Sequence, residues 1–183
     1  AAKKKGISVT AEVTPHHLAL TQDAVDGYDV NAKVNPPLRE DGDRCALIDG
    51  LCDGTIDAIA TDHAPHAITD KEVGFQDSSF GVVGFETMLP IILNLVHEKK
   101  ITIERMIESL TSSPAKTLNL KDRGTLNVGS VADIVIFDPE SVWTIHSKDF
   151  LSKARNTPFD GLRVRGKILF TISKGKIVYK FPS

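Results

Sequence analysis

The order of apolar and polar positions in the first 120 residues is typical of strands that alternate with helices. Residues 7–13 alternate with period two, which predicts a strand that ends at Thr14-Pro15. Residues 56–61 are almost wholly apolar, the pattern of a parallel strand covered on both faces. Between them, residues 41–52 have helical periodicity and a capping Asp41 at the start. This alternation predicts an α/β fold for residues 1–123.

Further helices and a change to β structure are predicted downstream. A helix over 85–100 should kink at Pro90 because proline removes a helical hydrogen bond, and Thr102 should cap the next helix. A third helix should open at Ser113-Pro114. From 124 to 183 the pattern becomes all-β. The strands expected there cover 131–137, 162–172 and 176–180, the last two forming a hairpin through 173–175.

Two long loops interrupt this pattern. Residues 18–40 lack a clear period, and Pro36 and Pro37 stiffen the Val34 to Arg39 stretch within them. Residues 64–84 form a polar, glycine-bearing loop of about twenty residues, longer than the ~12 to 15 at which structureless loops become uncommon. Loops of that length are usually functional, so we expect the chemistry near the second one.

Composition excludes several classes of protein. The chain has 183 residues, 41% hydrophobic and 25% charged, with a net charge of -2, which excludes disorder, collagen and coiled coil. Basic residues are scattered, so nucleic acid is not an expected partner. The longest apolar stretches, 89–96 and 131–137, are far short of the roughly 20 residues of a membrane helix, so no membrane span or signal peptide is expected.

The two cysteines do not predict a disulfide. Cys45 and Cys52 fall in the predicted helix with Ile48 on one face, and seven residues of helix separate their Cα atoms by about 10.5 Å. That distance exceeds the roughly 7 Å limit of a disulfide. Two unpaired, buried thiols are expected, and a reducing, cytoplasmic setting fits them.

The strongest candidate for chemistry follows the apolar strand at 56–61. Asp62, His63 and His66 stand at the head of the long loop, and active sites of parallel α/β sheets lie at this strand edge. The alternative is that Asp62 caps a turn and the histidines are surface groups. The strand position and the length of the loop favour the functional interpretation.

Other candidate residues are weaker. His16 and His17 are adjacent and so point in different directions, which favours a packing or supporting role over metal binding. His97 and His146 are expected to be surface or helix-capping residues. The 80–84 segment, Phe-Gly-Val-Val-Gly, does not closely follow a strand, so its glycines are interpreted as a lid whose backbone approaches a ligand.

Several motifs, in order along the chain, resemble those of type I dihydroorotases in the amidohydrolase superfamily. A further stretch, Gly124 to Val135, resembles the strand by which such chains leave the barrel for a β-sandwich. The resemblance covers almost the whole chain. The motifs are Val13-Thr14-Pro15-His16-His17-Leu18, Val34-Asn35-Pro36-Pro37-Leu38-Arg39, Thr61-Asp62-His63-Ala64-Pro65-His66 and Phe80-Gly81-Val82-Val83-Gly84-Phe85-Glu86-Thr87.

The resemblance implies the seventh and eighth strands of a (β/α)8 barrel with one or two zinc ions at its C-terminal face. Asp62 matches a zinc-binding aspartate that also moves a proton from the nucleophile to the leaving nitrogen. Asn35, His66 and the Phe80-Gly81 backbone match positions that hold the substrate. The implied reaction interconverts N-carbamoyl-L-aspartate and dihydroorotate in pyrimidine synthesis.

The remaining zinc ligands of the family lie upstream of this chain, which contains no His-x-His. One aspartate cannot hold zinc alone, and Ala1 to Gly6 has the composition of a helix C-terminus. We therefore expect a C-terminal fragment, with residues 1–123 from the barrel and 124–183 from the β-sandwich. The resemblance also implies a homo-oligomer, with association with aspartate carbamoyltransferase left open.

Two other functions compete with this interpretation. One is a related cyclic-amide hydrolase, namely a dihydropyrimidinase, hydantoinase or allantoinase; Asn35 and His66 favour dihydroorotase instead. The other is a non-catalytic barrel that supports a partner enzyme, and the retention of Asp62 favours catalysis over it.

Overall fold

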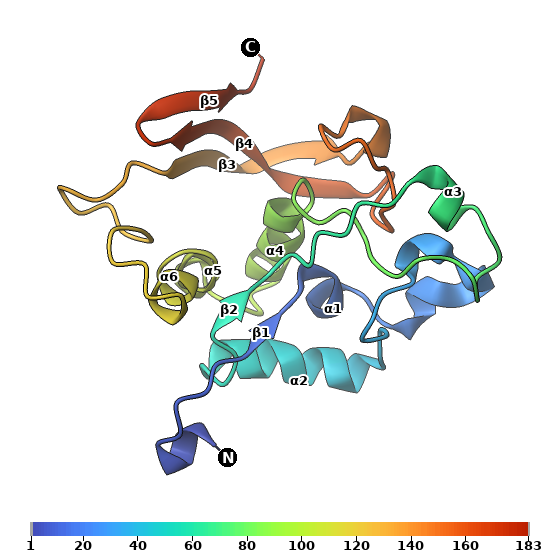
Figure 1. Ribbon diagram of the computed structural model, residues 1–183, viewed down its shortest axis with the longest axis horizontal. Coiled ribbons are helices and arrows are strands. Elements are labelled where there is room, and N and C mark those ends of the chain that lie inside the picture. Colours follow the sequence, from blue (N-terminus) through green and yellow to red (C-terminus); the bar gives the residue numbers. More distant parts are fainter. Residues whose placement is uncertain (1, 183) are drawn as a thin grey trace.

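The computed structural model describes residues 2–182, and helices and strands alternate through its first part as the sequence predicts (Figure 1). Ala1 lies outside the described residues, but Lys3–Lys5 form a 3-10 turn closed by a left-handed Gly6, in line with the predicted helix end. The helices are α1 (Pro15–Ala19), α2 (Asp41–Cys52), α3 (Ile68–Lys71), α4 (Met88–His97), α5 (Ile103–Leu110) and α6 (Ser112–Thr117). The strands are β1 (Glu12–Val13), β2 (Ala58–Ile59), β3 (Ile134–Thr144), β4 (Arg163–Ser173) and β5 (Lys176–Lys180). Short 3-10 turns cover Gln22–Tyr28, Val30–Ala32 and Ser147–Asp149.

β1 and β2 form a parallel pair, with Val13 opposite Ile59. Both strands are shorter than the predicted 7–13 and 56–61, because only two residues of each find a partner in the described chain. Val13 and Ile59 are buried, whereas residues 7–12 are exposed. The strand–α2–strand order places the ends of β1 and β2 at one edge of the pair.

α2 has the predicted bounds, but its buried face differs from the prediction. Ile48 and Leu51 are buried, while Cys45 and Cys52 are free and exposed. The expectation of buried thiols is therefore wrong: apolar residues at a spacing of three take the core positions and turn the thiols outward. The expected absence of a disulfide agrees with the free cysteines.

α4 packs between the two sheets. It starts at Met88, so Pro90 falls in the first turn, where no helical N–H bond is lost, and the expected kink has no cause there. Ile92, Leu93 and Leu95 are buried in the core against Val13 and other apolar residues. Within residues 2–182, no helix is long and apolar enough to cross a membrane.

The antiparallel sheet β3-β4-β5 forms the opposite end of the molecule (Figure 1). The predicted hairpin joins β4 to β5 through Lys174 and Gly175, both with positive φ, as in a type I′ turn. β3 starts later and runs longer than the predicted 131–137. α4 lies so close to β4 that a β carbon at Gly166 would collide with Leu93.

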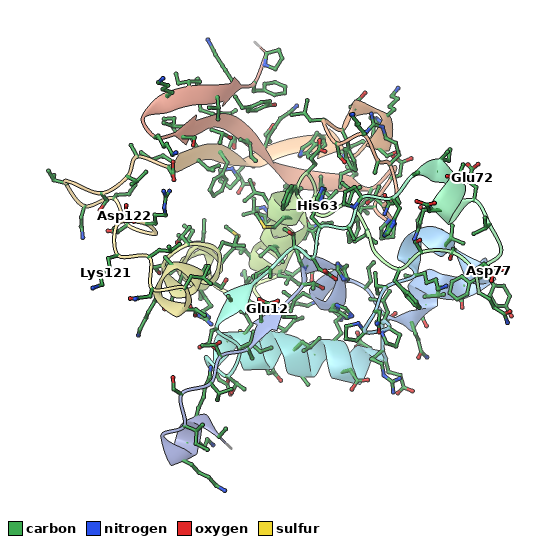
Figure 2. The ribbon with its side chains drawn as sticks, viewed as in Figure 1. Glu12, His63, Glu72, Asp77, Lys121 and Asp122 are labelled. Carbon is green, nitrogen blue, oxygen red and sulfur yellow. The ribbon has the colours of Figure 1, made fainter. Side chains whose placement is uncertain are left out.

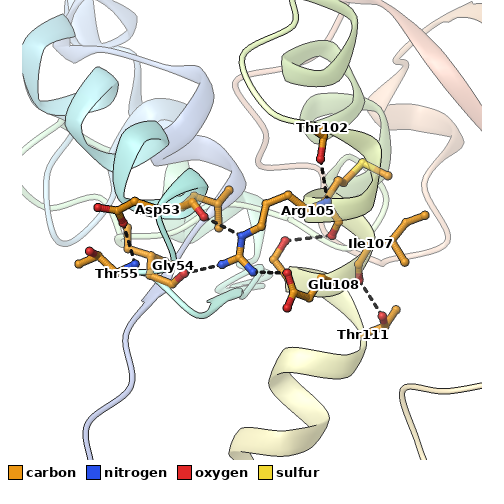
Figure 3. A network of polar contacts seen from close by, with 12 residues as sticks. Asp53, Gly54, Thr55, Thr102, Arg105, Ile107, Glu108 and Thr111 are labelled. Atoms are coloured by element: carbon orange, nitrogen blue, oxygen red, sulfur yellow. Dashed lines mark hydrogen bonds and ion pairs between the residues drawn. The ribbon is translucent and has the colours of Figure 1, made fainter. Parts of the chain in front are cut away.

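Arg105 ties α5 to the α2–β2 connection (Figure 3). Its Nε donates to the carbonyl of Leu51 at 2.6 Å and its Nη2 to that of Ile56 at 2.7 Å. Its Nη1 pairs with Glu108 at 2.7 Å. Thr102 caps α5 as predicted, accepting from the Arg105 amide. We call Arg105 and its partners the helix clamp.

Candidate active site

Asp62 follows the carboxyl end of β2 with a φ of 48°. Aspartate is among the few side chains that tolerate this left-handed conformation. Its side chain is exposed, and among residues 2–182 no hydrogen-bond partner is found for its carboxylate. The carboxylate is therefore open to a ligand at the edge where β1 and β2 both end.

His63 has a structural role next to Asp62. Its Nδ1 accepts the Gly84 amide at 3.1 Å, and its ring stacks on Phe85 with centroids 4.0 Å apart. A parallel bridge also joins His63 to Val82. His63 thus ties the start of the long loop to its end, in the centre of the molecule as viewed in Figure 2.

His66 lies against the second half of the same loop. Its Nε2 is 2.8 Å from the carbonyl oxygen of Phe80. A carbonyl oxygen can only accept, so Nε2 carries a proton and Nδ1 is the nitrogen left for a ligand. The predicted pair of His66 and Phe80 is therefore in direct contact.

Asn156, which sequence reasoning missed, joins the two halves of the loop from 90 residues away. It is 5% exposed, and its Nδ2 donates to the carbonyls of Ala64 and Gly81 at 2.9 and 3.0 Å. Its Oδ1 accepts the His66 amide, and its carbonyl accepts the Val83 amide. No local signal in the sequence marks this residue, because its partners are distant along the chain.

Gly81 permits the closest approach in the loop. Its φ is 120°, and a β carbon there would lie 2.5 Å from the Ala64 Cβ. Only glycine fits both restrictions. The glycine pattern at 80–84 therefore brings the loop against the strand end that carries Asp62.

Two buried lysines lie under the segment 75–81. Lys33 and Lys71 are 7% and 3% exposed. Lys33 Nζ donates to three main-chain carbonyls, and Lys71 Nζ to the carbonyls of Ser79 at 2.8 Å and Gly81 at 3.3 Å. Burial lowers the pKa of Lys71 from its usual value, the nearby Lys33 ammonium lowers it further, and Asp29 acts in the opposite direction.

The β1 end supports the neighbouring loop. His17 Nε2 is 2.9 Å from the Pro36 carbonyl, and its Nδ1 is 2.6 Å from Thr14 Oγ1, consistent with the supporting role expected for this histidine. Asn35 is exposed and precedes a cis bond to Pro36. His16 is 2% exposed, and its Nε2 has no partner among the described residues. Burial, with a smaller effect of His17, lowers the pKa of His16 to about 3.

The other two histidines lie away from this edge. His97 contacts the Pro139 carbonyl at 3.1 Å, and His146 is exposed. Neither one approaches the residues that follow β1 and β2.

Residues 2–182 contain no group of three or more His, Cys, Asp or Glu side chains that could hold a metal ion. Asp62 alone fits one ligand position, because its carboxylate is exposed and unbonded. A surface hollow of about 770 Å³ lies between α1, α2 and α4, and its lining does not include Asp62 or His66. The candidate site is therefore assigned from the residues at the strand edge.

The amidohydrolase family model matches residues 1–178. The chain belongs to the amidohydrolase family. Curated relatives include dihydroorotases from Geobacter metallireducens and Anaplasma phagocytophilum, each 50% identical over 98% of this chain. The chain spans 42% and 40% of their lengths. The predicted resemblance to dihydroorotases is thereby confirmed.

Solved structures of this amidohydrolase fold agree with the structure. L-Hydantoinase (dihydropyrimidinase) from Arthrobacter aurescens matches with a TM-score of 0.92 and 34% sequence identity. The match covers 98% of this chain and 41% of the hydantoinase chain. Dihydropyrimidinase from Brevibacillus agri gives 0.91 and 29% over the same shares. The mixed helix and strand content is that of part of such a fold.

Proposed function

We propose that this chain is the C-terminal part of a zinc-dependent dihydroorotase that interconverts N-carbamoyl-L-aspartate and dihydroorotate in pyrimidine synthesis. Residues 1–123 would supply the seventh and eighth strands of a (β/α)8 barrel, and 124–183 a β-sandwich segment. The parallel β1-β2 pair and the relatives at about 50% identity support this assignment. The open Asp62 carboxylate at the carboxyl end of β2 is the observation that carries it.

Asp62 would hold zinc together with ligands from the upstream part of the barrel. Bound zinc polarises the amide carbonyl and makes water a nucleophile at neutral pH. The Asp62 carboxylate then takes the proton of the attacking water and returns it to the leaving ring nitrogen, as general base and then general acid. Within residues 2–182 its carboxylate has no hydrogen-bond partner, which leaves both oxygens available for these roles.

The ring carboxylate of dihydroorotate calls for donors beside Asp62. His66 Nδ1 faces no described partner, and it donates only when the ring carries both protons. Asn35 adds an exposed amide from a loop that His17 and the two prolines hold. The backbone at Phe80 and Gly81 completes this set through the Phe80 N–H, because the Gly81 amide already donates to the Lys33 carbonyl.

The activity can be tested in a chimera. This chain would replace the C-terminal 42% of the dihydroorotase from Geobacter metallireducens, which supplies the upstream zinc ligands. We expect dihydroorotate hydrolysis with zinc bound, and no hydrolysis in the matched Asp62→Ala chimera. A folded, zinc-loaded chimera that leaves dihydroorotate intact would contradict the proposal and favour a non-catalytic partner subunit.

A hydantoinase or dihydropyrimidinase is the second candidate, because the solved structures that match carry those names. In the complete enzyme, that is, this chain joined to the upstream part of the barrel, His66→Ala separates the two. Charge-assisted hydrogen bonds contribute about 1.5 to 3 kcal/mol, so kcat/KM for dihydroorotate should fall roughly 10- to 150-fold while that for dihydrouracil changes far less. Equal losses would remove His66 from carboxylate recognition, and faster turnover of dihydrouracil than of dihydroorotate by the unsubstituted enzyme would favour the second candidate.

The same proposal includes one or two zinc ions per complete site, a homo-oligomer and a cytoplasmic location, with a small molecule as substrate. The proposal also includes association with an aspartate carbamoyltransferase, which co-purification would test. The 183-residue chain alone should not retain stoichiometric zinc after dialysis, because Asp62 is its one matched ligand. One tightly held zinc per chain would show that the ligand assignment is wrong.

A further inference from the structure

Side-chain donors hold the carbonyl oxygens of most residues in the 75–81 segment. Lys33 Nζ binds those of Phe75, Gln76 and Ser78 at 2.6 to 2.9 Å. Lys71 Nζ binds that of Ser79 at 2.8 Å, and His66 binds that of Phe80. Three acceptors need three N–H groups, so Lys33 is a charged ammonium. The Lys33 ammonium and the Lys71 amino group therefore lie on the inner side of this segment.

Neither lysine has a carboxylate oxygen within 4.0 Å among residues 2–182. Lys3 shows the other arrangement: its Nζ binds the carbonyls of Gly54 and Thr55 but also pairs with Asp57 at 2.6 Å. A buried cation without a carboxylate partner is costly, and its charge acts on the groups around it. Here those groups are the peptide units that end at Phe80 and Gly81.

Lys71 fixes the orientation of the Ser79–Phe80 peptide through its hydrogen bond to the Ser79 carbonyl. In a trans peptide the C=O and N–H point in opposite directions, so an oxygen fixed on the buried Lys71 turns the Phe80 N–H away from the interior. Within the described chain this N–H has no acceptor, and Phe80 is 54% exposed. A hydrogen bond from Lys71 to the oxygen also polarises the N–H of the same peptide and makes it a stronger donor.

The neighbouring peptide is fixed at both ends. The Phe80 carbonyl accepts from His66, and the Gly81 amide donates to the Lys33 carbonyl at 2.9 Å. The Phe80 N–H is therefore the one amide between Asp77 and Gly81 that is left for a ligand.

We propose that Lys71, assisted by Lys33, is a positioning residue that orients and polarises the Phe80 N–H as a donor to the substrate. The proposal rests on the proposed function, because it assigns this amide to the ring or carboxylate oxygens of dihydroorotate. Lys71 touches no substrate atom and acts through the peptide.

The direct test is nuclear magnetic resonance of the complete zinc enzyme labelled with ¹⁵N-phenylalanine, with the Phe80 amide assigned by Phe80→Tyr. Addition of dihydroorotate, allowed to equilibrate with N-carbamoyl-L-aspartate, should move the Phe80 amide proton downfield, as a new hydrogen bond does. No response of this amide at saturating ligand would overturn the proposal, and this measurement needs no variant that folds poorly.

The kinetic test compares Lys71→Met with Lys3→Met, which also removes an ammonium from two carbonyls but far from the loop. Lys71→Met should raise KM for dihydroorotate roughly 10- to 100-fold, the scale of a misplaced binding group, with a smaller change in kcat and unchanged zinc content. Lys3→Met should leave KM unchanged. A KM for Lys71→Met equal to that of Lys3→Met would overturn the proposal.

Failure of the proposed function gives a different result. If the unsubstituted enzyme does not turn over dihydroorotate, the proposed dihydroorotase function is rejected. The response of the Phe80 amide is then measured with hydantoin as the ligand. A downfield response to hydantoin keeps the assignment of Lys71, and its absence removes that as well.

Discussion

The helix clamp and the 75–81 segment both use basic side chains to hold main-chain carbonyls, but they differ in burial and in charge balance. Arg105 binds two carbonyls and keeps Glu108 as a partner at 2.7 Å. Lys33 and Lys71 bind carbonyls without a carboxylate within 4.0 Å in the described chain. The clamp therefore contains an ion pair, whereas the two lysines of the 75–81 segment have none within the described chain.

This difference separates stability from function. Substitutions in the helix clamp should lower the free energy of unfolding with little effect on turnover. Substitution of Asp62, whose carboxylate has no hydrogen-bond partner in the described chain, should lower turnover with little effect on unfolding. Each prediction below tests one side of this division.

The largest effect is expected for Asp62→Asn in the complete enzyme. The amide cannot take up the proton, so kcat should fall by at least the ~10² to 10⁴ typical of general acid–base groups. Asparagine also tolerates the positive φ at this position, so the fold should remain. The measurement pairs steady-state kinetics with zinc analysis and thermal unfolding; near-normal turnover by a zinc-loaded variant would remove Asp62 from the mechanism.

Arg105→Met should lower the stability of the protein and leave its turnover unchanged. The carbonyls of Leu51 and Ile56 lose their donors, and unsatisfied buried acceptors cost about 1 to 3 kcal/mol each. We expect a loss of about 2 to 4 kcal/mol in urea unfolding, with KM of the folded enzyme unchanged. A large change in KM at unaltered stability would break the comparison.

Lowering the pH should reduce the free energy of unfolding of the unsubstituted protein, because of His16. The pKa of His16 is lowered from 6.5 to about 3 in the folded chain, so between these pH values the unfolded chain binds a proton that the folded chain does not. Stability from this group is complete above pH 6.5 and decreases as the pH falls towards 3, by about 2 kcal/mol at pH 5.

To test this, the free energy of unfolding is measured as a function of pH for the unsubstituted protein and for His16→Phe. The variant should lose this part of the slope, while His146→Gln, at an exposed site, should keep it. Equal slopes for all three proteins would show that His16 is protonated in the folded state.

The smallest effect is expected for Glu108→Gln. Its carboxylate is 56% exposed, and surface ion pairs contribute about 0 to 1 kcal/mol. Unfolding by urea should therefore shift far less than for Arg105→Met. A loss as large as that of Arg105→Met would mean that the ion pair, and not the carbonyl contacts, fastens α5.

Local signals predicted much of this molecule. Thr102 and the 173–175 turn act through neighbours in sequence, so a helix cap and a hairpin could be placed. The predicted kink at Pro90 was wrong, because the helix starts three residues later than expected. Asp62 was singled out because active sites of parallel sheets lie at the carboxyl ends of strands, and its role in catalysis stays a prediction. The exposure of Cys45 and Cys52 depends on which helix face meets the core, and periodicity left that choice open.

The missing parts of the site are those that tertiary contacts create. The side chain of Lys33 reaches over 40 residues to its carbonyl partners, and a lone lysine beside Asn35 carries no pattern that would reveal this. The same holds for the role of His63, which depends on the return of the loop at Gly84. Sequence motifs and hydrophobic periodicity do not predict contacts between residues so far apart along the chain.

The Asn156 contacts have a consequence for how the molecule is made. They span 73 to 92 residues (from 156 − 83 = 73 upwards), and closing so long a stretch of chain costs entropy that only docking of the later segment can offset. During synthesis, residues 64–66 and 80–83 leave the ribosome well before Asn156 exists to join them. The loop beside Asp62 can therefore take its final form only after the chain has been made to that point, so that shorter nascent chains do not yet have a finished site.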